Sequence, residues 1–145
     1  MKRAVIVARP NPNSLTSSLG AANAPSVKAL GQEVLARDLY LMKFDPCLSA
    51  IENPIASSFQ FAAEVVSERQ ELVDVDVFAF VYPFWFNAPP AILKGYVDRV
   101  FSMGFGYEPE MGGTESLLDG KKLISFSTSG APNQWVRGPV PCRPR

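Results

Sequence analysis

Three aromatic side chains stand in succession between a predicted buried strand and a predicted helix: Phe84, Trp85 and Phe86, flanked by Pro83 and Asn87. Loops of this kind usually lie at the surface, so three aromatic rings there need a cover. Either a planar ligand lies against them, or the loop packs against its own core or a partner subunit. In open α/β sheets, ligands bind at the loops that follow the carboxyl ends of strands. The segment is therefore a candidate wall of a planar-cofactor site.

A second candidate lies in residues 9–18, a turn that precedes a predicted helix and contains six asparagine, serine or threonine residues. Hydroxyl groups, together with the free N–H groups of a helix N-terminus, bind anions, and phosphate is the expected guest. The alternative is simple N-capping, for which serine and asparagine are common. Capping accounts for one such residue and leaves the others unexplained.

The pattern of apolar residues places these segments in an alternating α/β chain. Short apolar runs predict four strands, at residues 4–8, 34–36, 77–81 and 123–127. Helical spacing predicts three helices, one after the first turn, one over 62–73 and one over 91–101. This order is typical of a doubly wound parallel sheet, in which all strands end at one edge. A third turn of small residues, 127–130, would then lie beside the other two.

Two features interrupt this pattern. Pro25 lies within the first predicted helix and is expected to break or kink it, and Gly31 is expected to end it. Residues 39–57 are predicted to be a long irregular loop, which in compact domains tends to be functional or mobile. Residues 102–120, rich in glycine and carrying Phe105 and Tyr107, are predicted to be flexible and to lie at the surface.

The composition limits the chemistry. The 145 residues suffice for one domain, and 14 basic against 14 acidic residues give no net charge, which argues against a nucleic-acid or anionic-membrane partner. No apolar run is long enough to span a membrane, and the N-terminus lacks a signal-peptide layout. Two distant cysteines, Cys47 and Cys142, fit a reducing, cytoplasmic setting. Without histidine, the chain offers no histidine-based zinc site or Ser–His–Asp triad, and no metal site is predicted.

Four stretches of the chain resemble the flavodoxin-like NAD(P)H:quinone oxidoreductase family of the DT-diaphorase type. They are residues 9–16, 59–61, 82–101 (YPFWFNAPPAILKGYVDRVF) and 127–131. The resemblance implies an α/β, flavodoxin-like doubly wound parallel sheet. It also implies a bound flavin, either FAD or, as the second choice, FMN, with NAD(P)H as co-substrate.

The resemblance assigns roles to individual residues. The family's phosphate-binding turn is matched by Asn13, Ser14, Leu15 and Thr16, and Arg9 replaces the histidine typical of that turn. Gln60 matches a glutamine near the dinucleotide. The wall against the isoalloxazine ring is matched by Pro83, Phe84, Trp85, Phe86 and Asn87. The turn that faces the pyrimidine edge of the ring is matched by Ser127, Thr128, Ser129 and Gly130.

The implied activity is a two-electron, ping-pong reduction. A hydride passes from NAD(P)H through flavin N5 to a quinone or a similar acceptor. The catalytic groups would be the backbone N–H groups around Ser129 and Gly130, which stabilise the anionic reduced flavin, and Trp135, which stands where many members have a catalytic tyrosine. Family members are dimers, so a homodimer is expected.

The alternation of strands and helices stops at Gly138. Residues 138–145 contain three prolines, which exclude a helix or a central strand. We therefore expect a flavin-binding domain over 1–137 and an irregular Pro/Arg-rich tail over 138–145, without the last strand and helix of the fold. This ending reads as a truncation, so two alternatives stay open. One is a non-catalytic flavodoxin-like module, such as the ancillary reductases of potassium-efflux systems, and the other is an inactive fragment.

Overall fold

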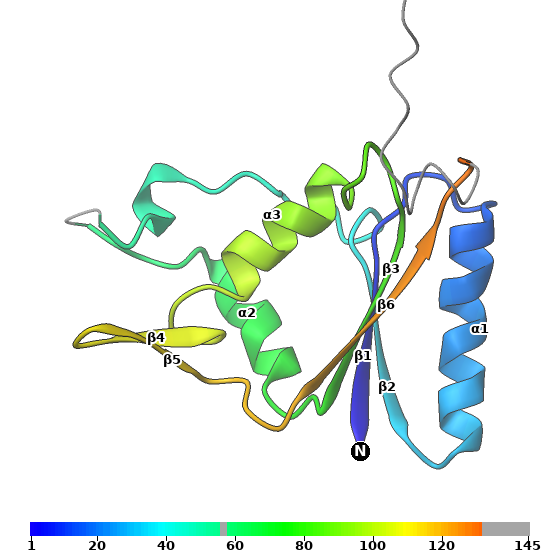
Figure 1. Ribbon diagram of the computed structural model, residues 1–145, viewed down its shortest axis with the longest axis horizontal. Helices are drawn as coiled ribbons and strands as arrows, with labels where there is room; N and C mark the ends of the chain where they lie inside the picture. The colour runs from blue at the N-terminus through cyan, green and yellow to red at the C-terminus, as the bar shows by residue number, and fades with distance from the viewer. Residues whose placement is uncertain (56–57, 132–145) are drawn as a thin grey trace, which may run out of the picture.

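Four parallel strands form the central sheet, in the order β2-β1-β3-β6 (Figure 1). The strands are β1 (Lys2–Val7), β2 (Glu33–Asp38), β3 (Val77–Pro83) and β6 (Lys122–Thr128). The computed structural model describes residues 1–55 and 58–131. Within this part, the predicted parallel α/β sheet is confirmed, and β6 pairs on one side only, with β3. The predicted tail over 138–145 lies outside the described residues, as does Trp135.

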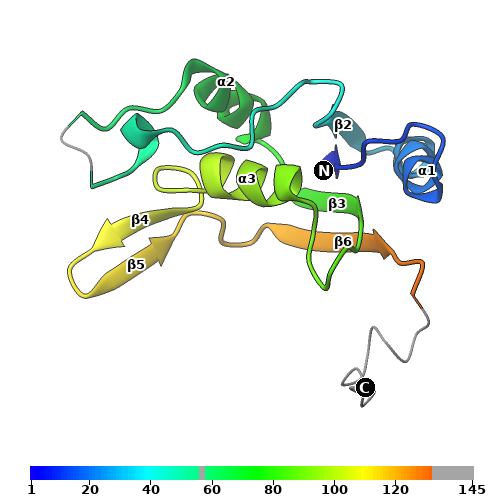
Figure 2. The same cartoon turned by 90° about the horizontal axis from the view of Figure 1, so that it is seen from above.

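Helices cover both faces of the sheet. Helix α1 (Leu15–Ala29) lies on one face, and α2 (Ala63–Leu72) and α3 (Ala91–Val100) lie on the other, as Figure 2 shows. Alternate side chains of β1 serve the two faces: Ala4 and Ile6 join the larger cluster of buried residues, and Val5 and Val7 join the smaller one. No helix of the described ranges is both long and apolar enough to cross a membrane.

Strand β2 is longer than the predicted 34–36. Its polar ends, Glu33, Arg37 and Asp38, lie opposite Lys2, Ile6 and Val7 in the parallel ladder with β1. Backbone hydrogen bonds extend the strand beyond its apolar run at both ends, from Glu33 to Asp38.

Pro25 does not break α1, so the expected break is wrong. The helix runs from Leu15 to Ala29 with Pro25 inside it, and Gly31, with φ +71°, follows its end as expected. Close packing against the sheet offsets the lost backbone hydrogen bond. At Gly20, an added Cβ would lie 2.9 Å from Cγ2 of Val7, so any other residue there would require the Val7 side chain or the helix to shift.

The segment over 102–120, predicted to be flexible and to lie at the surface, contains a β-hairpin that the apolar pattern did not predict. Strands β4 (Tyr107–Glu110) and β5 (Gly113–Ser116) pair antiparallel, and Gly112 turns the chain between them with φ +98°. The strands are short and mostly polar, so they lack the alternation of apolar residues by which strands are recognised. In Figure 2 the hairpin lies beyond α3, away from the sheet.

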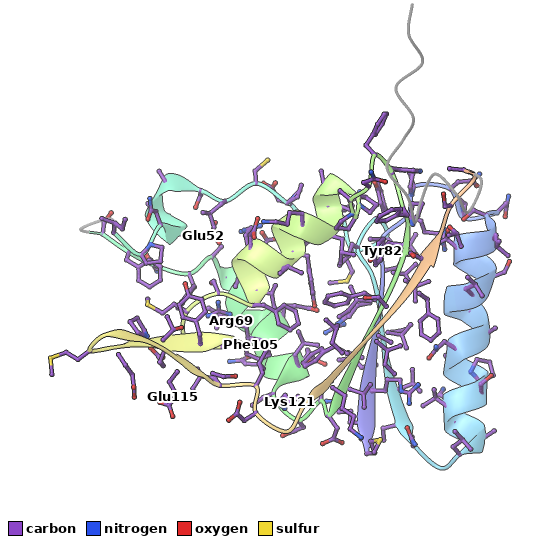
Figure 3. All side chains as sticks on the ribbon, viewed as in Figure 1. Glu52, Arg69, Tyr82, Phe105, Glu115 and Lys121 are labelled. Atoms are coloured by element: carbon purple, nitrogen blue, oxygen red, sulfur yellow. The ribbon has the colours of Figure 1, made fainter. Side chains whose placement is uncertain are left out.

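A buried ion pair fixes α3 beneath the loop that precedes α2. The Arg99 side chain, 4% exposed, donates from Nη2 to Oε1 of Glu52 at 2.9 Å. It also donates to the backbone carbonyl of Asp45. Glu52 belongs to a short 3-10 helix, η1 (Ala50–Glu52), and Figure 3 shows it beside α3. These contacts attach the last turn of α3 to the segment over 45–52.

Burial and hydrogen bonding act in opposite directions on Glu52. Burial alone would raise the pKa of this carboxyl group. Hydrogen bonds from the Ser49 N–H and from Arg99 outweigh burial and hold its pKa below the usual value. Glu52 is therefore a buried carboxylate that depends on its partners.

Arg69 contacts the same C-terminal end of α3. Its guanidinium donates to the backbone carbonyls of Arg99, Val100 and Met103 at 3.1, 2.9 and 3.1 Å. It also lies 4.0 Å from the ring centre of Phe61 and 5.9 Å from that of Phe105, the latter visible in Figure 3. Burial lowers the pKa of Arg69. The arginine satisfies the last carbonyls of the helix, which have no partners within it.

Candidate functional site

The three candidate turns meet at the carboxyl edge of the sheet. A cavity of about 400 Å³ opens between them, within the usual size of small-molecule sites, about 300–1,000 Å³. Its lining comes from all three turns: Arg9, Pro10, Asn11, Ser14, Leu15, Thr16, Pro83, Phe84, Trp85, Thr128, Ser129 and Gly130. The structure thus brings together segments that are more than 100 residues apart in sequence. Their role as ligand contacts stays a prediction.

The first turn caps α1 and still has free donors. Ser14 is the N-cap residue, and its Oγ accepts the Ser17 N–H at 3.3 Å and donates to the Asn11 carbonyl at 3.0 Å. The capping alternative is therefore correct for Ser14. Leu15 and Thr16 line the cavity, and their N–H groups, in the first turn of α1, lie outside the hydrogen-bond ladder of the helix. They are placed to bind an anion.

Two direct hydrogen bonds join the turns. The Oγ1 atoms of Thr16 and Thr128 lie 2.6 Å apart, which links α1 to the end of β6. The Phe84 N–H donates to the carbonyl of Thr128 at 2.7 Å, which links the aromatic loop to the same residue. Thr128 is therefore the common contact of all three turns.

Two of the three aromatic residues of the loop line the cavity. Phe84 and Trp85 line the cavity, and Trp85 is 47% exposed. Phe86 is fully exposed and lies, with Asn87, at the tip of a tight turn closed by hydrogen bonds between Trp85 and Ala88. Both tip residues have positive φ, +49° and +58°, as a type I′ turn requires. The exposure of Trp85 and Phe86 shows that the loop does not pack against its own core.

Several residues matched from the family do not line the cavity. Asn13, Phe86, Asn87 and Ser127 belong to the right turns but are absent from its lining. Gln60 is exposed, and its backbone N–H donates to the carbonyl of Ile51 at 2.9 Å. The segment between η1 and α2 that carries Gln60 lies on the far side of α3 from the cavity (Figure 1). The structure therefore does not bring Gln60 to this cavity, and its place near the dinucleotide stays a prediction.

The sequence reasoning missed Asp38. This residue ends β2 at the same edge, and its Oδ2 lies 3.3 Å from Nη2 of Arg9. The rule that all parallel strands end at one edge could have identified it. Pro10 and Asn11 were not singled out either, although both lie within the first turn.

The donors and rings at this edge fit a flavin. Two aromatic residues, Phe84 and Trp85, line the cavity, together with hydroxyl-bearing residues of the other two turns. The Nε atom of Arg9 is buried and has no acceptor in the described part of the chain. Among the described residues, no group of three or more His, Cys, Asp and Glu could hold a metal ion. A planar ring attached to an anionic group is the kind of molecule that this set of contacts suits.

Comparison with known proteins gives the same fold. A family model described as "Flavodoxin-like fold" matches residues 1–140. An uncharacterized NAD(P)H oxidoreductase of Haemophilus influenzae is 38% identical over 135 residues, which cover 90% of this chain and 65% of that protein. NAD(P)H dehydrogenase (quinone) 1 of Cavia porcellus is 30% identical over 156 residues, covering 93% of this chain and 56% of that one. The chain thus spans just over half to just under two thirds of these relatives.

Solved structures share this fold. The NAD(P)H:quinone oxidoreductase of Methanothermobacter marburgensis is similar to this chain with a TM-score of 0.82 and 26% identity, over 94% of this chain and 70% of that one. An FMN-dependent NADH-azoreductase of Bacillus anthracis, solved in complex with FMN, has a TM-score of 0.70 at 20% identity, over 91% and 70% of the two chains. At that identity the second likeness shows the fold alone.

Proposed function

Because this chain belongs to the family described as flavodoxin-like fold, we propose that it is a flavin-dependent oxidoreductase that uses NAD(P)H to reduce a quinone or a similar acceptor. One observation carries the proposal: three turns meet around one cavity, with aromatic rings from one turn and hydroxyl and N–H groups from the others. The names of the relatives, an NAD(P)H oxidoreductase and an NAD(P)H dehydrogenase (quinone), support the choice of both substrates.

Each part of the cavity has a task in this proposal. Phe84 and Trp85 hold the flat face of the ring, and the turn over Ser14, Leu15 and Thr16 binds the phosphate. The N–H groups around Ser129 and Gly130 face the pyrimidine edge, where they stabilise negative charge. A bound flavin would supply the redox chemistry, the transfer of a hydride from NAD(P)H and the two-electron reduction of the acceptor, and these residues would hold and orient it. The proposal includes Trp135 as a further catalytic residue in the place of the family's tyrosine.

FAD was the first expectation from sequence, and FMN was the second. The azoreductase neighbour, solved with FMN, supports testing FMN alongside FAD. A homodimer and a cytoplasmic location are further parts of the proposal, to be tested by light scattering and by cell fractionation.

The experiment that tests the activity is an anaerobic reduction followed by spectroscopy. The purified protein is incubated with FMN or FAD, freed of unbound flavin, and mixed with NADH or NADPH. We expect a yellow protein whose flavin absorption bleaches and then returns when menadione is added as the quinone. A yellow protein that does not bleach would support the non-catalytic module instead. A protein that takes up neither flavin would contradict the proposal.

Removing the Trp85 ring should weaken flavin binding, because this side chain lines the cavity. We expect Trp85→Ala to raise the dissociation constant for FMN about 5- to 30-fold, the effect of losing roughly 1–2 kcal/mol of aromatic contact. Phe86→Ala is the matched control, because Phe86 is exposed and does not line the cavity. Fluorescence titration of flavin-free protein measures both. If Phe86→Ala weakened binding more than Trp85→Ala, the assignment of the ring wall would be wrong.

A further inference from the structure

Strand β6 lies at one edge of the central sheet. Within the described residues it pairs with β3 and with no other strand, and Figure 2 shows it as the outermost strand beside β3. Because backbone groups of alternate residues point to opposite sides of a strand, one row of N–H and C=O groups of β6 faces away from the sheet. Such a row can form backbone hydrogen bonds with another extended segment.

The two edges of the sheet differ in their protection against such pairing. Strand β2, at the opposite edge, has charged side chains at three of its six positions. Strand β6 has one in seven, Lys122, at its first position. Its apolar side chains are partly exposed, with Leu123 at 63%, Ile124 at 37% and Phe126 at 36%. Charged side chains commonly protect edge strands, so β6 is the edge that is open to association.

Ile124 and Phe126 lie on the same face of the sheet, the face against which α1 packs. In the ladder between β3 and β6 they are the partners of Ala79 and Val81, which belong to the smaller cluster of buried residues. Phe126 also borders a cavity of about 290 Å³ beside α1. The apolar surface of this face therefore continues to the rim of the sheet, where it ends in two partly exposed side chains.

The sequence of β6 is complementary to a second copy of itself. When two identical strands pair antiparallel about a two-fold axis, residues at equal distances from the axis lie opposite each other on one face. With the axis at Ser125, the middle of the seven-residue strand, every residue of β6 has a partner. Ile124 of each copy then lies opposite Phe126 of the other. Lys122 lies opposite Thr128, which keeps the two lysines at opposite ends of the ladder.

The neighbouring registers fit less well. An axis at Ile124 would place Lys122 opposite Phe126, a charged side chain against an aromatic one. An axis at Phe126 would place Ile124 opposite Thr128 and would leave the first two residues of β6 without partners. The register about Ser125 is therefore the one that combines the longest ladder with apolar cross-strand pairs.

We propose that a second copy of this chain binds along β6, antiparallel and about a two-fold axis at Ser125, so that the two four-stranded sheets join edge to edge. Ile124 and Phe126 of both copies then cover one another at the joint. The edges that remain are the two copies of β2, which carry charged side chains, so the assembly closes at two chains. The inference does not rest on the proposed function, because antiparallel pairing places the two flavin cavities at opposite ends of the ladder.

Sedimentation velocity over a wide range of protein concentrations tests the assembly. We expect the wild-type protein to form a dimer. Ile124→Lys and Phe126→Glu should each weaken it on the order of 10-fold, because the two-fold axis removes two cross-strand pairs at once. Leu41→Lys is the matched control, since Leu41 is 82% exposed and follows β2, the strand farthest from β6. We expect this variant to dimerise as the wild type does.

A mixture of the two β6 variants tests the register. In the proposed pairing, the ammonium introduced by Ile124→Lys lies opposite the carboxylate introduced by Phe126→Glu. The unchanged Phe126 of the first chain lies opposite the unchanged Ile124 of the second. We therefore expect the mixture to form dimers more readily than either variant alone. A mixture that dimerises no better than the single variants would overturn this register.

A disulfide provides a test that does not depend on a charged substitution, which could unfold the strand. Ser125→Cys is introduced into a chain with Cys47→Ser and Cys142→Ser. Residues opposite each other in an antiparallel pair have Cα atoms about 4.5–5.5 Å apart, a separation that a disulfide spans. Under mild oxidation we expect a covalent dimer on a non-reducing gel. Ser127→Cys in the same background is the control and should stay monomeric on the gel, because its two copies lie on opposite sides of the axis.

The outcomes separate this inference from the proposed function. A wild-type protein that is monomeric at every concentration would overturn the inference, as would assemblies larger than a dimer. A dimer that Leu41→Lys dissociates and the β6 variants do not would place the interface elsewhere and overturn it too. Flavin titration of Ile124→Lys should match that of the wild type, since Ile124 does not line the cavity. A wild-type protein that dimerises through β6 and binds no flavin would uphold this inference and overturn the proposed function.

Discussion

Replacing Arg99 with methionine is expected to lower the free energy of unfolding by about 3–5 kcal/mol, since it leaves the buried carboxylate of Glu52 without its charged partner. Both side chains are almost inaccessible, at 4% and 2% exposure. Glu64, the second acidic contact of Arg99, is 45% exposed. Losing this exposed ion pair therefore lowers the stability only slightly. Chemical denaturation followed by circular dichroism measures the change.

A double variant separates the charge from the packing. Arg99→Met combined with Glu52→Gln removes both charges, and we expect it to recover most of the lost stability, because a neutral pair of similar volume costs little to bury. If the double variant were as unstable as Arg99→Met alone, the loss would come from packing and not from an uncompensated charge.

The same pair gives a pH dependence with a defined sign. The folded protein holds the pKa of Glu52 below its usual value, so this group stabilises the fold above the pKa of the unfolded chain. That contribution is lost as the pH falls through the folded pKa. In Arg99→Met the carboxyl group of Glu52 stays buried without its charged partner, so protonation of Glu52 stabilises the folded variant. The difference in stability between wild type and variant should therefore shrink below about pH 4, near the ordinary pKa of glutamate.

Replacing Gly95 with alanine is the second change with a large expected effect. Gly95 lies within α3, and a Cβ built there would overlap the carbonyl oxygen of Pro46 and lie 2.6 Å from its Cα. The obstacle is backbone, which cannot rotate away, so the loop over 45–52 has to move off α3. We expect a loss of about 2–3 kcal/mol from overpacking, although alanine favours helices over glycine by about 1 kcal/mol.

Gly113→Ala is the control for this change. No atom lies within 4 Å of a Cβ built on Gly113, and its φ is not in the left-handed region. We expect its midpoint of thermal unfolding to stay within a few degrees of the wild-type value. If Gly95→Ala also left the midpoint of thermal unfolding unchanged, Pro46 would not lie as close to α3 as the structure places it.

The central sheet could be predicted from the sequence because each of its buried strands is marked by a short run of neighbouring apolar residues. The runs at 4–8 and 77–81 are continuous and apolar, as expected for parallel strands buried on both faces. The hairpin at 107–116 was missed because its strands present polar side chains such as Glu108 and Glu115. Whether Pro25 breaks α1 depends on how the helix packs against β1, and helical periodicity in the sequence carries no information about that packing.

The candidate site was predictable to the level of turns and not of side chains. Parallel strands end at one edge, so the three turns had to lie together. Which side chain of a turn points inward depends on the alternation along the strand and on turn type. Thr128 contacts Thr16, so its neighbour Ser127 points to the other face. Phe86 lies at a turn tip with positive φ. Asp38 and Arg9 lie 29 residues apart and meet only once β1 and β2 pair.

A crystal structure of the protein with FMN would test the central claim most directly. We predict that the isoalloxazine ring lies between the aromatic residues Phe84 and Trp85 and the turn over 128–130, with the phosphate at the first turn of α1. A flavin bound against another surface, with this cavity left empty, would contradict the account.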